Sequence, residues 1–265
     1  MAVLYGTQSD GSLIPVQADA QGRLVAELAG VDQAVQGDLL VTGNVQMLSL
    51  NGGQLAGFRN WIINGNFTVN QRAGTRTPGV GVYGFDRWKG HASGLEQVVE
   101  ALPAGEYTLS WSGGGNGSFG GITAAAPITA TVAGGDTSVI VPSDATLVQL
   151  EPGPVATPFE HRPIGIELAL CQRYFFVTQS RYFCSQNCSN TVSDSNKYGF
   201  VNIPLPVTMR VNPTVDAASV SPNSAINAVV RRSEKDVIVV TMEATATQPA
   251  NTAGLNAGLA ADAEL

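Results

Sequence analysis

Apolar and polar positions alternate over short distances in the middle of the chain, which predicts a domain built of strands. Short apolar stretches recur about every ten residues there, and Gly or Pro lies between most of them. The expected strands are Gln97–Leu102, Glu106–Trp111, Ile128–Val132, Ser138–Val141 and Ala145–Leu150. This spacing is typical of a sandwich or a jelly-roll-like domain, which we place over residues 58–162.

The pattern of strands returns in the last third of the chain and predicts a C-terminal β-sandwich-like domain over residues 179–265. The expected strands are Phe200–Val207, Val237–Met242, weaker ones around Val215 and Val229, and a closing strand in the tail Ala257–Leu265. Pro204 and Pro206 lack the backbone N–H that a sheet ladder needs. The strand that holds them is therefore expected at an edge or with a bulge.

A helical pattern interrupts the strands only after Pro163, which suits a first helical turn. Apolar residues then recur on two sides of the expected helix: Ile166, Ala169, Leu170 and Tyr174 on one, and Leu168, Cys171 and Phe175 on the other. We predict a connecting helix over residues 163–178. A helix that hides two faces usually lies between domains, or between a domain and a second chain.

The first 57 residues are expected to form a small attachment and stalk segment. Ser12–Gln17 and Gly22–Leu28 alternate on either side of a turn, which predicts a hairpin too small to hold a core of its own. In residues 35–53 the turn pairs Gly37-Asp38 and Gly43-Asn44 lie six positions apart, each before an apolar residue. Such a repeat favours a winding β-structure that three chains would shelter around one axis, and an ordinary hairpin is the alternative.

Charge is scarce and its balance is acidic. Charged residues make up 13% of the chain, against roughly 25% in an ordinary soluble domain, and the net charge is −7. An acidic chain is a poor ligand for phosphate backbones, so we expect no nucleic-acid partner. No apolar run approaches the roughly 20 residues that span a bilayer, and the N-terminus does not resemble a signal peptide. We expect synthesis in a cytosol and no membrane insertion.

No residue pattern points to catalysis, to a metal or to a cofactor. The three cysteines Cys171, Cys184 and Cys188 are an odd number, and the two histidines are remote from them in sequence. Cys171 occupies a core-like helical position, where a thiol is inert. The chain has no G-x-S-x-G elbow and no Walker motif, and no two carboxylates stand out as an acid–base pair. Gly113–Gly117 is expected to be a loop tip.

Three aromatic side chains are candidates for contact with a glycan or another receptor. Trp111 lies next to the glycine run, and Tyr182 and Phe183 are adjacent, although plain packing is the alternative for all three. Trp61 and Trp88 are expected to anchor the core.

Two charged positions are expected to be engaged within the fold. Asp86 and Arg87 lie between aromatic residues, which predicts a partly buried charged pair. Arg173, on the connecting helix, is expected to be paired, so that Arg173→Ala would destabilise the fold.

Several segments together resemble phage tail-fibre and receptor-binding proteins. The first block carries Asn60-Trp61, Ile63 to Phe67 (with Asn64, Gly65 and Asn66), Gln71-Arg72 and Gly74, and the Asp86-Arg87-Trp88 element follows it. The longest block runs from Leu150-Glu151 through Ala156 to Glu160, Arg162-Pro163 and Glu167-Leu168 to Cys171-Gln172-Arg173-Tyr174-Phe175. The likeness covers about residues 58–265, and the N-terminal residues are similar to the starts of structural proteins from phages of cyanobacteria.

The resemblance implies a non-enzymatic virion component on a tail fibre or another exterior appendage. Such a protein would be a homotrimer, joined to another virion protein through its N-terminus, and would contribute to attachment to a host surface glycan. Family members usually carry a longer jelly roll than residues 89–149 allow, so the expected domain is a reduced one. The alternatives are a head fibre, a capsid decoration or cement protein, and a glycan-degrading fibre enzyme.

Overall fold

The structure is a computed structural model of the chain. It describes residues 57–178, 198–215, 226–244 and 259–264, together with several short strands outside these ranges. The backbone divides into two compact units, Met1–Met47 and Leu48–Leu265. Among the described residues strands predominate and one helix occurs, so the prediction of a mostly β protein is confirmed.

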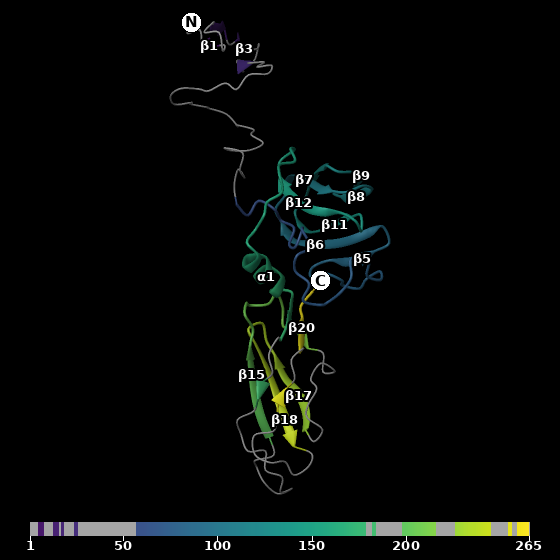
Figure 1. Cartoon of the computed structure of the whole chain (residues 1–265), viewed down its shortest axis with the longest axis vertical. Helices are drawn as coiled ribbons and strands as arrows, with labels where there is room; N and C mark the ends of the chain where they lie inside the picture. The colour runs from purple at the N-terminus through teal and green to yellow at the C-terminus, as the bar shows by residue number, and fades with distance from the viewer. Residues whose placement is uncertain are drawn as a thin grey trace. The chain divides into compact units, whose positions relative to one another are not determined.

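The N-terminal unit contains two short antiparallel pairs. β1 (Tyr5–Thr7) pairs with β2 (Leu13–Pro15), and β3 (Gln17–Ala18) pairs with β4 (Leu24–Val25) (Figure 1). The expected pairing of Ser12–Gln17 with Gly22–Leu28 is therefore found only in part: Gln17 pairs with Val25, whereas Leu13–Pro15 pairs with β1. The predicted repeat stretch, residues 35–53, lies outside the described residues.

The second unit begins with two sheets. The larger sheet has the order β5-β6-β11-β8-β9 and the smaller sheet the order β10-β7-β12. The strands are β5 (Lys89–His91), β6 (Gly94–Leu102), β7 (Gly105–Ser112), β8 (Asn116–Phe119), β9 (Ile122–Ala125), β10 (Ile128–Val132), β11 (Gly135–Val141) and β12 (Thr146–Pro152).

Residues 60–65 complete the smaller sheet. The Trp61 amide donates to the Leu150 carbonyl at 2.9 Å, and the Val148 amide donates to the Gly65 carbonyl at 2.8 Å, so this segment runs beside β12. With it in place the strand order is that of a jelly roll, in which two Greek-key sheets face each other. A side chain at Gly65 would place its Cβ 2.1 Å from the Val148 oxygen, which explains the glycine.

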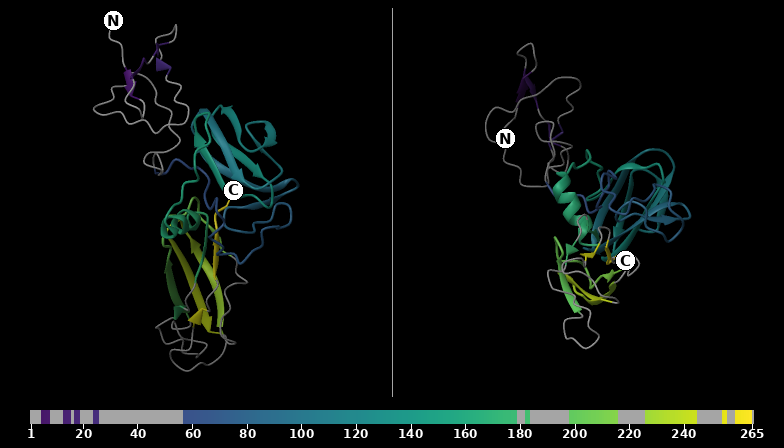
Figure 2. Two further views of the ribbon diagram at one scale, coloured as in Figure 1. Left: turned by 45° about the horizontal axis from the view of Figure 1, so that its top comes forward. Right: turned by 60° about the horizontal axis from the view of Figure 1, so that its bottom comes forward.

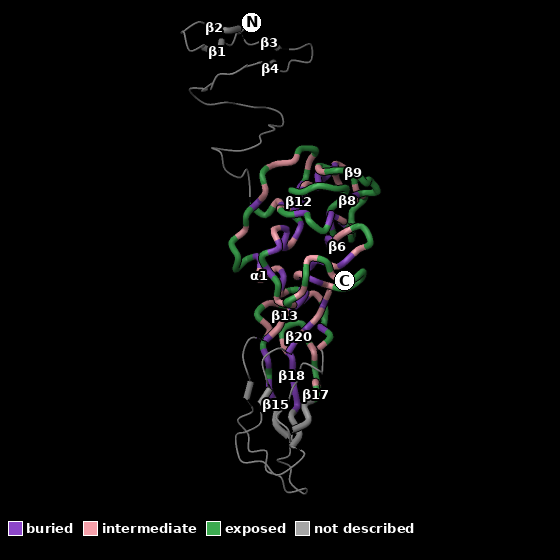
Figure 3. Tube along the Cα trace, turned by 45° about the vertical axis from the view of Figure 1, so that its right-hand side comes forward, coloured by how far each residue is buried: buried purple, intermediate pink, exposed green. Residues whose placement is uncertain are grey.

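The core lies between these two sheets. Residues of β6 alternate between buried and partly exposed positions, as expected for a strand with one face on the core and the other towards solvent (Figure 3). The fully buried side chains of this core include Trp88, Phe119, Leu95, Leu109 and Leu150.

Three strands of this domain, β5, β8 and β9, were not expected from the sequence. β8 begins inside the glycine run that we interpreted as a loop tip. Gly117 and Phe119 are buried in this strand, and Ser118 between them is half-buried. A strand whose inward positions include glycine carries too weak an apolar signal to be recognised by alternation.

Helix α1 (Ile164–Gln172) follows Pro163, as predicted, but is shorter than the expected range of 163–178. Phe175–Val177 forms strand β13 instead. The buried helical residues are Glu167 and Cys171, whereas Ile166, expected on a buried face, is 37% exposed. In the described part of the chain, no helix has the length and apolar character needed to cross a membrane.

The C-terminal part forms two further sheets, with strand orders β13-β20-β16 and β15-β18-β17, and a pair β14-β19 (Figure 2). Their bounds are β14 (Tyr182–Phe183), β15 (Tyr198–Pro204), β16 (Thr214–Val215), β17 (Ile226–Ser233), β18 (Val237–Ala244), β19 (Gly254–Leu255) and β20 (Ala260–Asp262). A second core joins them through Ile203, Met209, Ile238, Val240 and Ala261. β15 is an edge strand that ends at Pro204, as its prolines predicted.

Candidate functional site

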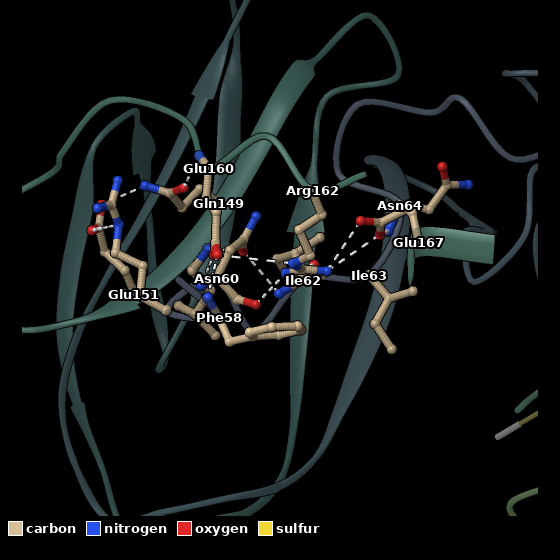
Figure 4. A network of polar contacts seen from close by, with 12 residues as sticks. Phe58, Asn60, Ile62, Ile63, Asn64, Gln149, Glu151, Glu160, Arg162 and Glu167 are labelled. Carbon is tan, nitrogen blue, oxygen red and sulfur yellow. Dashed lines mark hydrogen bonds and ion pairs between the residues drawn. The ribbon is translucent and has the colours of Figure 1, made fainter. Parts of the chain in front are cut away.

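The residues that carry the resemblance gather around the segment Phe58–Asn64, where side chains from distant parts of the chain bind its backbone. We call Asn60, Gln149, Glu151, Glu160, Arg162 and Glu167 the inner network (Figure 4). All six side chains are buried or nearly so. A polar group in such a place is tolerated only when it is hydrogen-bonded, so the partners of each side chain determine its role.

Glu160 binds the start of this segment. Its carboxylate accepts hydrogen bonds from the Phe58 amide and, at 2.8 Å, from the Asn60 amide. The Glu160 amide in turn donates to the Gln149 side chain at 2.8 Å, and Gln149 donates to Glu151 at 2.8 Å. The two carboxylates therefore act as fixed acceptors for the backbone and for neighbouring side chains.

Arg162 holds the middle of the segment. Its guanidinium donates to the carbonyls of Asn60 and Ile62, and it pairs with Glu167 on α1 at 3.2 Å. Glu167 also accepts a hydrogen bond from the Asn64 amide. The planar fork of arginine can serve two carbonyls and a carboxylate together, which a lysine cannot do.

Asn64 closes the segment with a tight turn. Its backbone has a positive φ of 57°, a conformation that asparagine tolerates better than most residues. Its side chain accepts from the Val69 amide and donates to the carbonyls of Val69 and Asp86. The Trp88 indole donates to the Asn64 carbonyl at 2.9 Å, which fixes the ring within the core. The neighbouring Asn66 accepts from the Thr68 hydroxyl at 3.0 Å, in exposed surroundings.

A second group of charges connects the jelly-roll domain to the end of the described chain. We call Arg72, Arg87, Asp262 and Glu264 the tail cluster. Arg87 pairs with Glu264, and Arg72 pairs with Asp262 at 2.9 Å and Glu264 at 3.4 Å. The expected pairing of Asp86 with Arg87 is therefore wrong. Both residues are buried, but Asp86 accepts from the Gln71 side chain and backbone instead.

Aromatic rings surround the two arginines of the tail cluster. The Arg87 guanidinium lies 3.5 Å from the ring centre of Tyr174, and that of Arg72 lies 3.7 Å from the ring centre of Phe175. Cation–π contacts of this kind gain strength when water is excluded.

Burial shifts the protonation of several groups here. Burial raises the pKa of the Glu264 carboxyl, and the nearby Arg87 and Arg72 oppose this shift. Burial also raises the pKa of Asp86, against the opposing hydrogen bonds from Gln71. Burial raises the pKa of the Cys171 thiol well above its ordinary value, which makes that thiol unreactive.

The carboxylates of the inner network and the tail cluster are engaged by partners within the fold. They bind backbone amides and arginines, and the Cys171 thiol is buried, as its core-like helical position predicted. Among the described residues, no group of three or more His, Cys, Asp and Glu side chains is placed to hold a metal ion.

The expected contact residues lie elsewhere. Trp111 is only 8% exposed and belongs to the jelly-roll core, so the interpretation of this residue as a surface aromatic is wrong. Trp111 and Leu109 lie two positions apart on β7, and both are buried. The glycine run that follows Trp111 hid this alternation in the sequence. Tyr182 and Phe183 form β14, and their side chains lie outside the described residues. Trp88 is in the core as predicted, whereas Trp61 is 36% exposed.

Comparisons of the sequence and of the fold with known families, curated proteins and solved structures found no match. The fold and the site therefore define this chain as a mostly β protein in which a jelly-roll domain and a C-terminal pair of sheets are joined by buried charges.

Proposed function

We propose that this chain is a structural component of a bacteriophage virion, of the tail-fibre or receptor-binding type, and that it works as a homotrimer. Two lines of reasoning support the proposal. The first is the sequence resemblance of the blocks around Asn64, Asp86 and Arg162. The second is what the residues of those blocks do in the fold.

One observation carries the proposal: the blocks that resemble the phage family supply five of the six residues of the inner network and both arginines of the tail cluster. Glu160, Arg162, Pro163 and Tyr174 all lie where the jelly-roll domain meets the helix and β13. An enzyme keeps its defining residues around a place where a substrate can bind. An adhesin or a fibre component instead needs its defining residues to fix one domain against the next, so that exposed loops are presented on a stiff support.

In this proposal the N-terminal segment joins another virion protein, and the β domains face outward. Binding to a host glycan would come from several weak contacts made at once by three copies, because linked sites gain affinity through effective concentration. The protein would have no catalytic activity and no cofactor.

The mass of the purified full-length protein in native solution tests the homotrimer. The expected mass is three times the 27.5 kDa of one chain. A mass of one chain at micromolar concentration would refute this part of the proposal.

Cryo-electron microscopy of virions carrying a labelled copy of the protein tests the location. The label is expected on the tail, and a label confined to the head would indicate a head fibre or a decoration protein instead. Incubation with host polysaccharide tests the remaining alternative, because new reducing ends would reveal a glycan-degrading enzyme.

A further inference from the structure

The segment 259–264 has two faces that serve different parts of the chain. Three of its residues are no more than 2% exposed and belong to the core of the C-terminal sheets: Leu259, Ala261 and Ala263. Asp262 and Glu264 alternate with them, and their carboxylates pair with arginines of the jelly-roll domain. Alternate side chains of a strand point to opposite sides, so β20 and the residues next to it contribute to two domains at once.

Backbone contacts fix this segment in the middle of a sheet. β20 lies between β13 and β16 and pairs antiparallel with both. The Ala263 amide donates to the Tyr174 carbonyl at 2.7 Å. The Arg210 side chain donates to the Ala263 carbonyl at 2.9 Å and to the Glu264 carbonyl at 3.1 Å. The sheet therefore positions the two carboxylates, and the segment that carries them is the central strand of that sheet.

Polar contacts connect the jelly-roll domain to the C-terminal sheets at this place. Among the residues that the structure describes, the two apolar cores have no member in common. Glu100, on β6, accepts a hydrogen bond from the Tyr174 hydroxyl at 2.7 Å and pairs with Arg210 at 3.4 Å. The pair of Glu264 with Arg87 is buried more deeply, and loss of the Glu264 charge would leave Arg87 without compensation.

We propose that residues 259–264 are a strap that couples the jelly-roll domain to the C-terminal sheets, so that the two unfold together while the strap is held and separately once it is released. Glu264 is the main anchor of the strap, because its side chain is 4% exposed and pairs with both Arg87 and Arg72. The Asp262 side chain is 40% exposed and makes one ion pair, with Arg72. This inference goes beyond the proposed virion role and depends neither on that role nor on the number of copies.

Glu264→Gln tests the strap, because it removes the charge and keeps the size of the side chain. Glu234→Gln is the matched control, since it makes the same substitution in the C-terminal sheets, between β17 and β18. The Glu234 side chain is 49% exposed, and its partner Arg232 is 71% exposed, so this pair anchors no other part of the chain.

Two probes follow the two domains separately during unfolding in urea. The three tryptophans, Trp61, Trp88 and Trp111, all lie in the jelly-roll domain, so their fluorescence follows that domain. Met209 is 1% exposed in the core of the C-terminal sheets, so its methyl signal in NMR spectra follows those sheets, and a Met209→Leu variant identifies it. Probes within one cooperative body lose their native signals at the same urea concentration.

At one protein concentration, we expect the two midpoints to coincide in the parent and in Glu234→Gln. In Glu264→Gln we expect the native Met209 signal to be lost at a lower urea concentration than the native tryptophan signal, with the midpoints apart by on the order of 1 M. The C-terminal core should unfold first, because release of the strap withdraws Leu259, Ala261 and Ala263 from it.

Coincident midpoints in Glu264→Gln, whether shifted together or unchanged, would overturn the inference, because the charge would then contribute only to overall stability. Separate midpoints in the parent would also overturn it, because the strap would then couple nothing. If Glu264→Gln does not fold, the milder Asp262→Asn decides: a smaller separation in the same order supports the strap, and coincident midpoints refute it. The native mass tests the homotrimer independently, so either proposal can fail while the other stands.

Discussion

Replacing Arg162 with alanine should be among the most damaging single changes in this protein. The side chain is 5% exposed and serves three acceptors at once: the carbonyls of Asn60 and Ile62 and the carboxylate of Glu167. Its removal leaves a buried carboxylate with one backbone donor and two carbonyls without their partner. Breaking a buried pair in this way costs about 3–5 kcal/mol.

Arg173→Ala provides the comparison. Arg173 is paired with Glu100 at 3.6 Å, as expected from the sequence, but its side chain is 46% exposed. An exposed pair contributes at most about 1 kcal/mol, so this variant should melt nearly like the parent. By comparison, the free energy of unfolding that Arg162→Ala is expected to lose corresponds, for a unit of this size, to a fall in melting temperature on the order of 10 °C.

Urea unfolding followed by tryptophan fluorescence measures both free energies, because Trp88 lies in the core next to the inner network. Arg162→Lys should give an intermediate loss, since a lysine keeps the charge but cannot reach all three acceptors. If Arg162→Ala loses no more stability than Arg173→Ala, the buried contacts do not hold the segment and the reasoning fails.

Three further outcomes follow from the same geometry. Burial raises the pKa of Tyr83 and of Tyr174 to about 12, so the absorbance of these two phenols should change late in an alkaline titration, and a Phe variant of each identifies its signal. Their contribution to the free energy of unfolding should be complete below about pH 10 and should be lost as the pH rises towards 12. With the other two cysteines replaced by serine, Cys171 should react with a thiol reagent only after unfolding, and rapid reaction of the native protein would contradict its burial. Gly65→Ala should destabilise by about 1–3 kcal/mol in a melting experiment, because its Cβ would meet the Val148 carbonyl, and an unchanged melting temperature would show that the backbone can yield there.

The strands with a clear alternation of apolar residues could be predicted from the sequence, and those rich in glycine could not. Ile128–Val132 was placed at its observed bounds, and Val237–Met242 lies within β18. β8 and β9 were missed because glycine, serine and alanine supply too little apolar contrast for a period of two to stand out. Helix α1 was placed correctly at its start, where Pro163 is a local signal, and its end was missed.

Local sequence patterns could not predict the partners of the buried charges. Asp86 and Arg87 are neighbours in sequence, which suggested that they pair. Successive side chains diverge, however, and the positive φ of 71° at Arg87 turns the backbone further. Arg87 instead meets Glu264, 177 positions later. No pattern within a window of ten or twenty residues could predict a contact over that separation, whereas the resemblance at least marked Arg87 as a residue with a role.

The distribution of charge connects these findings. The chain has few charged residues, and four arginines, Arg59, Arg72, Arg87 and Arg162, have side chains no more than 13% exposed. Each is paired with a carboxylate, so these charges contribute to joining segments and little to solvating the surface. The outward faces must then rely on hydroxyls, amides and glycine, or be covered by other copies. Exposed apolar side chains such as that of Ile164 then remain in contact with water, and covering them with a partner would be favourable.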